Sequence, residues 1–526
     1  MKINRVCILG GGFSGFVVSS ILAKYKESFG LDFNIKVIYN KDIIGVGESS
    51  LFSINELFSY LGIEDSDWMT KCNATYKTSI RFENFYKKGR YFHYPFGPSR
   101  HDVSVQKWFT LKEFYPDVFT PERASLYFNA QSIFNEENKL CNNDDYLKHN
   151  AAYHFDSPLL AQYLKEYSEK RGVEVINDTF YGVEQDKYGN VESIVCDNGT
   201  YEADLFVDCS GFKSLLLGGV MGEDYIPFSD TLINNKALVA KIPYTDKEKQ
   251  LKNYTNCVAL DNGWCWEIPL WDGLSVGYVH TNKFATEEEV EKEFFKYVGE
   301  VDYRVVNFKT GRYKRGWVKN VVGLGLSYGF IEPLESTGIA STLENIFRLL
   351  ECLSKRDMFY TQIDRDLFNH YVGQKLDHYR SFVEMHYFLS HRDDSSYWRY
   401  TTENIDYDYG NDLKTGLWFN SYFRTGYQQF LDQMIVNRNL SAVFPDSNGN
   451  LVFTGTLFIV AGMNYSAYSK AFTYHQKNAD KDSLYKDCQL FKEYLKGLED
   501  AVQQYSSSYN YLRETLYKKT VEKVST

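Results

Sequence analysis

The first residues of the chain carry the feature that most constrains its fold. A short apolar run, Arg5–Leu9, precedes a glycine-rich turn and a helix-favouring stretch, Phe16–Lys26. The turn has the pattern GxGxxG, in which glycines allow a tight bend and the close approach of a pyrophosphate to a helix N-terminus. We expect it to bind a dinucleotide through Gly10, Gly12, Phe13, Ser14 and Gly15. A glycine-rich turn without a ligand is the alternative reading.

A second predicted strand, Asn34–Tyr39, follows at a suitable distance. An acidic residue is expected at its end, where it would hold the ribose hydroxyls of the dinucleotide. The sequence has Tyr39 and Asn40 there, with Asp42 slightly beyond, and this departure predicts weak cofactor binding.

A second glycine-rich loop begins at residue 45. Its residues Gly47, Glu48 and Ser49 offer backbone amides and a hydroxyl group, which suit a cofactor phosphate or ring edge. We therefore expect these three residues to contact the same dinucleotide.

Bulk composition excludes several classes of protein. A net charge of −11 disfavours a broad contact with nucleic acid. The nine cysteines are scattered and form no CxxC pair, which indicates free thiols in a reducing compartment rather than disulfides or a zinc site. No uncharged apolar run is long enough to span a bilayer. Met1–Ser20 superficially resembles a signal peptide, but it carries the glycine motif, so we expect a cytoplasmic enzyme.

Lys77 lies at the junction of two predicted elements. Asp65–Tyr76 has a helical pattern, and Thr78–Phe85 alternates like a strand that Lys77 starts. A single lysine is usually a solvated surface group. If Lys77 is buried between its apolar neighbours, its amine has a shifted pKa and becomes chemically useful.

Two aromatic segments are candidates for the walls of a pocket. Tyr91–Gly97 is an aromatic loop. In Gly263–Leu270, Trp264 and Trp266 share one face of a predicted strand, because alternate residues of a strand point the same way. A pair of indoles in the core is the alternative for the tryptophans. Aromatic residues make up 17% of the chain, so an aromatic-rich core explains most of them.

The stretch Ile331–Ala340 joins a buried run to an amphipathic helix. It places Glu332 and Glu335 beside Ser336, Thr337 and Gly338. Free backbone N–H groups at such a helix start can hold an anion, next to a carboxylate that can move a proton. Alternatively, Ser336 or Thr337 only caps the helix.

Together these motifs resemble the flavin-dependent halogenases of the tryptophan halogenase type, with similarity from residue 1 to about 400. The matching segments are GGGFSG at 10–15, GVGES at 45–49, LGIEDSDWMTKCNATYKTSIRF at 61–82, AYHFDSPLLAQYL at 152–164, RGVEV at 171–175, DCSGF at 208–212, GWCWEIPL at 263–270, EPLESTGI at 332–339 and HYFLSHRDDSSYW at 386–398. GxGxxG is shared by many flavoproteins, whereas GWxWxIP, the Lys77 context and EPLEST are specific in combination.

The resemblance implies a two-component enzyme. Reduced FAD would come from a separate flavin reductase, and FAD, oxygen and a halide ion (chloride, bromide or iodide) would make hypohalous acid. The halide would bind at the backbone of Thr337 and Gly338. Lys77 would activate the hypohalous acid, as a haloamine or by hydrogen bonding, and Glu335 would position it or take the proton of the arene.

The resemblance also implies roles around the cofactor. Ser336 would link the flavin and substrate sites, and Trp264 and Trp266 would keep the substrate away from the flavin. On the substrate side, relatives that act on tryptophan place His directly before the Pro-Phe of the aromatic loop. Here Tyr94 takes that position, His93 lies one residue earlier, and Phe96 follows. We therefore expect a different or broader indole- or phenol-type substrate.

The expected fold is α/β, with a two-dinucleotide-binding-type FAD module, a β-sheet layer and a mainly helical C-terminal substrate lobe. The expected parts are residues 1–230 and 310–345 for the FAD module, 231–309 for the layer and 346–526 for the lobe. Residues 98–150 read as rich in loops, and 453–465 read as a strand. The chain has no evident nicotinamide site, and a homo-oligomer is compatible with the sequence.

Two other functions fit parts of the pattern. One is a single-component FAD-dependent aromatic monooxygenase, a hydroxylase. Such enzymes usually carry a Gly-Asp flavin motif where this chain has Gly325-Leu326-Ser327. The other is a non-catalytic flavin-binding protein, against which the retention of both Lys77 and Glu335 argues.

Overall fold

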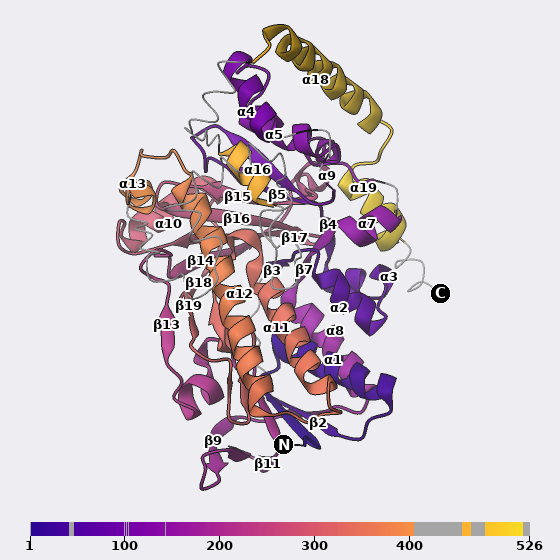
Figure 1. Ribbon diagram of the computed structural model, residues 1–526, viewed down its shortest axis with the longest axis vertical. Coiled ribbons are helices and arrows are strands. Elements are labelled where there is room, and N and C mark those ends of the chain that lie inside the picture. The colour runs from indigo at the N-terminus through magenta and orange to yellow at the C-terminus, as the bar shows by residue number, and fades with distance from the viewer. Residues whose placement is uncertain are drawn as a thin grey trace.

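The computed structural model is a mixed α/β fold with several sheets and many helices, which confirms the predicted fold class (Figure 1). It describes residues 2–40, 47–98, 100, 103, 105–141, 144–403, 455–463 and 479–518. Asp42 and the first two residues of the loop at 45–49 lie outside the described residues.

A six-stranded sheet forms the base of the molecule. Its strands, in spatial order, are β20 (Trp317–Val318), β21 (Val321–Gly323), β12 (Leu205–Asp208), β1 (Arg5–Leu9), β2 (Asn34–Tyr39) and β8 (Glu174–Asn177). All pairs are parallel except β20 with β21. The predicted strands at 5–9 and 34–39 are confirmed. Helix α1 (Phe13–Phe29) connects them, and it is longer than predicted at both ends.

A seven-stranded sheet forms a second layer. Its order is β18 (Arg304–Asn307), β14 (Lys236–Ile242), β17 (Gly273–His280), β16 (Gly263–Leu270), β15 (Tyr254–Ala259), β5 (Ser79–Glu83) and β6 (Tyr91–Pro95). The last two strands come from the N-terminal part of the chain, and β5 joins β15 in parallel. The aromatic loop at 91–97 is therefore mostly a strand of this layer.

A small sheet, β3-β7-β4, connects the two layers. Its strands are β3 (Gly47–Ser49), β7 (Ala152–Asp156) and β4 (Thr75–Lys77). The helix expected over Asp65–Tyr76 is wrong beyond its first turns: α3 (Asp65–Trp68) and a 3₁₀ turn (Met69–Cys72) end at Asn73, whose φ of 51° stops the helix. Lys77 consequently ends β4 instead of starting the next strand.

Two further three-stranded sheets lie at the periphery. One contains β9 (Phe180–Gln185), β10 (Val191–Cys196) and β11 (Thr200–Glu202), and the other contains β13 (Tyr225–Pro227), β19 (Gly311–Tyr313) and β22 (Gly329–Phe330). The nine cysteines are free thiols, as predicted.

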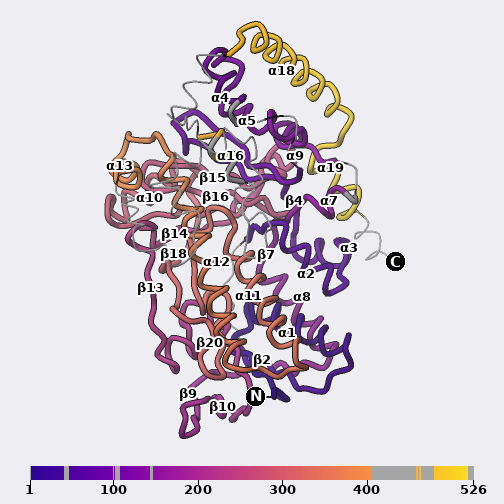
Figure 2. Tube along the Cα trace, in the orientation of Figure 1, coloured from indigo at the N-terminus to yellow at the C-terminus, as the bar shows by residue number. Residues whose placement is uncertain are grey.

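Helices cover the sheets and form most of the later part of the described chain. The first group is α2 (Ile54–Leu61), α4 (Val105–Phe114), α5 (Pro121–Phe128), α6 (Ser132–Glu136), α7 (Asp144–Asn150), α8 (Ser157–Glu169), α9 (Lys247–Gln250) and α10 (Glu287–Val298). The second group is α11 (Thr337–Ser354), α12 (Gln362–Phe388), α13 (Ser396–Glu403), α16 (Gly455–Gly462), α18 (Lys481–Val502) and α19 (Ser508–Leu512). Figure 2 shows α11 and α12 side by side next to the six-stranded sheet.

Two predictions about secondary structure are wrong in this set. Residues 98–150, expected to be rich in loops, contain four helices, α4 to α7. Residues 455–462 form helix α16 instead of part of a strand, and the remainder of the predicted strand lies partly outside the described residues. Phe458 and Ile459 are buried there, and a short apolar run does not distinguish a buried strand from a buried helix. No helix within the described ranges is long and apolar enough to cross a membrane.

The last described segment of the chain packs beside the strand that carries Lys77. The ring of Tyr517 stacks on Trp271 with centroids 3.8 Å apart. Its hydroxyl group donates a hydrogen bond to the backbone oxygen of Ala74, at 2.8 Å. The C-terminal segment thereby supports β4 from outside.

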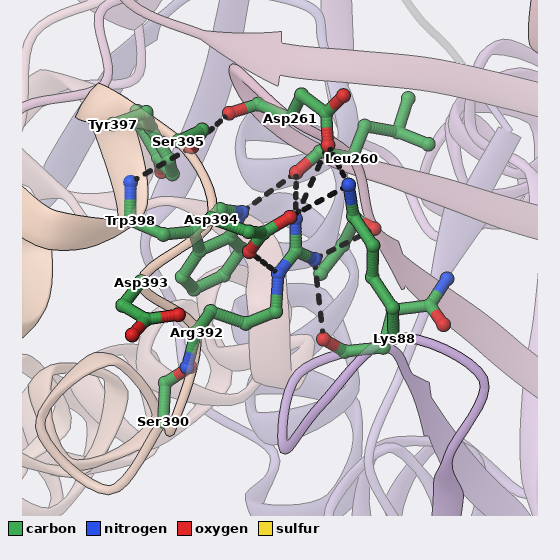
Figure 3. A network of polar contacts seen from close by, with 12 residues as sticks. Lys88, Leu260, Asp261, Ser390, Arg392, Asp393, Asp394, Ser395, Tyr397 and Trp398 are labelled. Carbon is green, nitrogen blue, oxygen red and sulfur yellow. Dashed lines mark hydrogen bonds and ion pairs between the residues drawn. The ribbon is translucent and has the colours of Figure 1, made fainter.

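A buried arginine holds the connection between α12 and α13 against the seven-stranded sheet. Figure 3 shows Arg392 between Asp261 and Asp394, with the ammonium group of Lys88 bridging the same two carboxylates at 2.8 and 2.6 Å. Arg392 also donates to the backbone oxygen of Leu260, at 3.4 Å. This network fixes the C-terminal end of α12 over the β15–β16 turn.

Candidate active site

A cavity of about 320 Å³ opens at the GxGxxG turn. It is bounded by the turn itself, by β3, by the loop after β12, by one face of the seven-stranded sheet and by the start of α11. The lining residues include Gly12, Phe13, Ser14, Gly47, Glu48, Ser49, Cys209, Phe212, Val239, Thr255, Trp266, Phe308, Pro333, Ser336, Gly338 and Ile339. Most residues predicted from the sequence to bind the cofactor therefore line one cavity.

The glycines of the turn fit a bound dinucleotide. A Cβ atom at Gly15 would lie 1.9 Å from the backbone oxygen of Gly10, and one at Gly10 would lie 2.2 Å from that of Cys209, so glycine is required for packing at both positions. A Cβ atom at Gly12 would meet no protein atom within 4 Å. Because Gly12 lines the cavity, its glycine keeps this space open for a ligand.

The end of β2 differs from an ordinary ribose site. The side chain of Tyr39 lies against Gly11, where an added Cβ atom would be 2.4 Å from the Cβ atom of Tyr39 and 2.6 Å from its ring. The Tyr39 hydroxyl group accepts a hydrogen bond from Lys165 Nζ at 3.0 Å. The neighbouring side chain of Asn40 donates to Thr179 Oγ1 at 3.5 Å, so neither residue supplies the carboxylate expected there.

Glu48 is the acidic residue of this cavity. Burial raises the pKa of its carboxyl group to about 7. In its protonated form this carboxyl group can donate a hydrogen bond to a cofactor instead of repelling its phosphates.

The Glu332–Gly338 turn opens helix α11. A 3₁₀ turn, Pro333–Glu335, is followed by Ser336 with φ 57°, and the helix begins at Thr337. Ser336 occupies the N-cap position, but its side chain makes no capping hydrogen bond. The hydroxyl of Thr337 is buried without a hydrogen-bond partner among the described residues. The interpretation that a side chain caps this helix is therefore wrong, and the first N–H groups of α11 remain available to an anion.

Lys77 is fully buried. Its Nζ atom donates hydrogen bonds to the backbone oxygen of Ser50 at 2.9 Å and to Ser336 Oγ at 2.8 Å, and it lies 5.3 Å from the ring centroid of Phe96. Burial lowers the pKa of Lys77 to about 7, opposed by the nearby charge of Glu335. A neutral amine has two N–H groups, and both are used here, so its lone pair is left free to react.

A chain of hydrogen bonds leads from Lys77 past the cavity. Ser336 Oγ bonds to Ser49 Oγ at 3.0 Å, and Ser49 Oγ bonds to Thr255 Oγ1 at 2.6 Å. His154 continues the chain, with Nε2 2.9 Å from Thr255 Oγ1 and Nδ1 3.0 Å from Thr75 Oγ1.

The two ends of this chain fix its direction. Lys77 Nζ donates to Ser336 Oγ, and the backbone oxygen of Pro269, which receives the Thr75 hydroxyl at 2.6 Å, can only accept. Each hydroxyl group has one proton, so every bond points from Lys77 toward Pro269. His154 is accordingly neutral with its proton on Nδ1, in agreement with burial, which lowers its pKa well below the usual value.

The two carboxylates of the turn have different partners. Glu332 Oε2 accepts hydrogen bonds from Asn234 Nδ2 at 2.7 Å, Trp264 Nε1 at 3.0 Å and the Tyr387 hydroxyl at 2.8 Å. Glu335 Oε1 lies 2.6 Å from His386 Nε2, and both side chains are 0% exposed. Glu335 Oε2 has no hydrogen-bond partner among the described residues.

Trp264 and Trp266 lie on one face of β16, with ring centroids 6.2 Å apart. Trp266 lines the cavity, whereas Trp264 is completely buried behind it and bonds to Glu332. The structure therefore brings one tryptophan to the cavity and uses the other to hold the turn.

The three residues predicted to contact the substrate divide between the two faces of β6. Tyr94 and Phe96 are neighbours, with centroids 5.7 Å apart, and Phe96 lies beside Lys77. His93 points to the opposite face, where Nδ1 is 2.7 Å from Ser79 Oγ and Nε2 is 3.8 Å from Glu136 Oε1. Alternation along the strand causes this separation.

Several residues of this site are not evident from the sequence. His386 and His154 lie in segments that carry the family resemblance, but neither was assigned a role. Thr255 and Thr75 have no motif of their own. The only signal for the two histidines was a titratable side chain in an apolar stretch that also resembles the family.

Comparison with known proteins identifies the family. The family model for tryptophan halogenases matches residues 5–463. The chain belongs to the tryptophan halogenase family. It is a flavin-dependent halogenase, which uses reduced FAD.

Individual relatives agree with this assignment. The 7-chloro-L-tryptophan 6-halogenase KtzR of Kutzneria sp. (strain 744) is 33% identical over 422 residues, which cover 75% of this chain and 81% of that protein. The structure titled VirX1 apo has 35% sequence identity and a TM-score of 0.87, with 98% of this chain and 100% of that chain covered. The tryptophan 6-halogenase SttH from Streptomyces toxytricini has 26% identity and a TM-score of 0.79, with 97% and 99% covered.

Proposed function

We propose that this halogenase uses Lys77 and Glu335 to deliver hypohalous acid to an electron-rich arene, of indole or phenol type. The observation that carries the proposal is that both side chains are fully buried and that Lys77 is hydrogen-bonded to Ser336, which lines the cavity at the start of α11. The charge of Glu335 acts on Lys77, and the free oxygen of Glu335 can take the proton of an arene.

Reduced FAD, when bound in the cavity, supplies the two electrons with which oxygen becomes the oxidant of the halide. The residues that would hold it are Gly12, Phe13 and Ser14 at the phosphates, Gly47, Glu48 and Ser49 along β3, and Trp266 and Ser336 at the inner end. A separate flavin reductase would provide the reduced form, and we expect Tyr39 to leave FAD weakly bound, so that the protein purifies without yellow colour.

The first turn of α11 is the proposed halide site. The backbone N–H groups of Thr337 and Gly338 have no partners within the helix, and a helix N-terminus favours an anion. Gly338 lines the cavity, and a Cβ atom there would meet nothing within 4 Å, so a halide ion has room beside it.

The proposed chemistry follows from the hydrogen bonds of Lys77. With both N–H groups donated, its lone pair can attack the halogen of hypohalous acid, or its ammonium form can donate to the oxygen of that acid. The ring of Phe96 lies 5.3 Å from the amine, and the ring of Tyr94 packs against it. We propose these two rings as contacts of the arene.

The proposed substrate is an arene other than free tryptophan, or a broader set that includes it. KtzR and SttH are named for tryptophan substrates, so tryptophan belongs in the test. Tyr94, in place of the histidine typical of such enzymes, is the feature that favours another arene.

Mass spectrometry of turnover mixtures tests the proposal. Each mixture contains the protein, FAD, a flavin reductase, NADH and oxygen, with one of three halides and a panel of tryptophan, other indoles and phenols. We expect halogenated product that depends on the halide. Hydroxylated product without halide dependence would instead establish a hydroxylase, and tight, regiospecific turnover of tryptophan alone would refute the broader substrate.

A further inference from the structure

His386 makes the closest contact to Glu335. It lies on α12, its Nε2 atom is 2.6 Å from Glu335 Oε1, and its Nδ1 atom is 2.9 Å from the backbone oxygen of Phe382. Neither side chain of the pair has any exposure to solvent. Water therefore does not compete for this hydrogen bond.

The partners of the imidazole ring decide where protons sit. A backbone oxygen only accepts, so Nδ1 of His386 must carry a proton. Nε2 then carries a second proton only if the ring is an imidazolium, in which case Glu335 is a carboxylate. If the ring is neutral, Nε2 accepts, and Glu335 Oε1 must be protonated. In both cases one proton lies in the 2.6 Å bond between the two side chains.

We propose that His386 is a positioning residue that shares a proton with Glu335 and thereby keeps Glu335 Oε2 able to accept the proton of the arene. This rests on the proposed role of Glu335 as the base. A carboxyl group that already holds a proton on Oε1 is a poor base. Transfer of that proton to His386 Nε2 as Oε2 is protonated moves the positive charge onto the imidazole.

The halogenation step balances with this arrangement. The C–halogen bond forms as the O–halogen bond of hypohalous acid breaks, and the departing oxygen gains one proton to become water. The ring C–H bond breaks, its electrons restore the aromatic ring, and its proton goes to Glu335 Oε2. The departing oxygen takes its proton from the Lys77 ammonium group, and the proton gained by the pair replaces it, so Lys77 and the pair both return to their starting states.

Other titratable groups face the pair from three sides. Lys77 approaches from β4, the thiol of Cys257 from β15, and Glu332 from the start of the same turn. Burial raises the pKa of the Cys257 thiol beyond its ordinary range, so this group stays neutral. Lys77 is held by Ser50 and Ser336, and the hydrogen-bonded oxygen of Glu332 by three donors. His386 is therefore the group that exchanges a proton directly with Glu335.

Two substitutions separate proton exchange from packing. His386→Gln keeps an N–H donor for Glu335 but cannot pass a proton, and His386→Phe keeps the ring volume without a hydrogen bond. His378→Gln is the matched control, because His378 lies on the same helix two turns earlier, away from the turn. Thermal melts and FAD titration check that each variant folds and binds the cofactor.

The measurement is the single-turnover halogenation rate with bromide, for the best arene of the panel and for its ring-deuterated form. In the native protein we expect electrophilic attack to limit the rate and therefore no isotope effect. In both His386 variants we expect a rate about 100-fold lower, as for loss of general base catalysis. A primary isotope effect should appear at the same time, because removal of the ring proton becomes slow. His378→Gln should match the native protein in both respects.

Each other outcome is decisive. A native rate in His386→Gln overturns the proposal. A slower rate without an isotope effect in folded, FAD-binding variants also overturns it and leaves His386 a structural role. Glu335→Gln is run beside them: if it halogenates at the native rate, the proposed role of Glu335 is wrong, independently of His386.

Discussion

The Glu332–Gly338 turn contains two carboxylates, Glu332 and Glu335, that are equally buried but have different hydrogen-bond partners. Glu332, at 0% exposure, receives three hydrogen bonds on one oxygen from neutral donors. Burial raises the pKa of its carboxyl group, and these donors oppose that shift. An amide, an indole and a phenol do not take up a proton at neutral pH, so their bonds with Glu332 hold the turn in place.

Glu335, also at 0% exposure, is hydrogen-bonded to the titratable ring of His386, and each of the two carboxylates has one oxygen without a hydrogen-bond partner among the described residues. It faces Lys77, whose pKa is lowered by the same burial. The comparison shows that burial alone does not make a carboxylate reactive. The difference lies at the hydrogen-bonded oxygen of each group: three neutral donors hold Glu332 in place, whereas Glu335 is bonded directly to the titratable ring of His386.

The largest effect on halogenation is expected at Lys77, which faces Glu335. Lys77→Met removes the amine that faces Glu335 while keeping a long apolar side chain in a buried position. We expect halogenated product to fall below detection in mass spectrometry, with FAD binding retained in a flavin fluorescence titration. Halogenation at the native rate would place the activating group elsewhere.

Lys77→Met should also stabilise the protein, by an amount that depends on pH. Because the pKa of Lys77 is lowered to about 7 in the folded state, the unfolded chain binds the extra proton between pH 7 and the ordinary lysine pKa. Stability of the native protein therefore rises with pH in this window, by about 1.4 kcal/mol per unit. Lys77→Met should melt at a higher temperature than the native protein at pH 7, and the difference should shrink toward pH 10. A constant difference would mean that Lys77 is not desolvated.

The second effect concerns the carboxylate partner. Glu335→Gln keeps the shape of the side chain but cannot take a proton. We expect halogenation to slow by roughly 10²–10⁴-fold, the range of general base catalysis, with little change in melting temperature. Glu332→Gln is the matched control, since its amide oxygen still accepts hydrogen bonds, and it should keep most of the activity. Equal losses of halogenation rate in the two variants would show that Glu332 and Glu335 do not differ in function.

How much of this site the sequence predicts depends on the range of the contact. The strands at 5–9 and 34–39, the glycine turn and the start of α11 follow from local patterns, and the structure has them. Strand alternation also explains why His93 points away from Tyr94, but the sequence had indicated a loop at 91–97 and so did not predict this. These features depend on residues within a few positions of one another.

The contacts that distinguish the carboxylates are long-range. His386 is 51 residues from Glu335, and Asn234 is 98 residues from Glu332. No periodicity brings such residues together, because the pairing depends on how α12 packs over the turn. Likewise, Asn73 ended the predicted helix before Lys77 by a backbone conformation that hydrophobic spacing does not reveal.

The third effect is on stability and is expected at Glu332. Glu332→Ala removes the acceptor of Trp264 and Tyr387, which then lie buried without it. Each buried unpaired group costs about 1–3 kcal/mol, so we expect the free energy of unfolding to fall by about 3 kcal/mol. Urea unfolding measures this loss. The halogenation rate per folded molecule should stay near the native value, and a selective loss of rate would show that Glu332 takes part in the chemistry.

The smallest effect is expected at Ser336. This residue of the turn joins Lys77 to the chain of hydrogen bonds that continues through Ser49 to His154. Ser336→Ala removes the acceptor of Lys77 and the link to Ser49. The loss of one hydrogen bond of this kind is worth roughly tenfold in rate, and single-turnover halogenation measures it. Since Ser336 has φ 57°, Ser336→Gly removes the same hydroxyl group while relieving the backbone. If the hydroxyl group matters, both variants slow by similar factors although Ser336→Gly is the more stable. If only the alanine variant slows, the backbone of the turn is the cause, and the chain from Lys77 to His154 does not contribute to the rate.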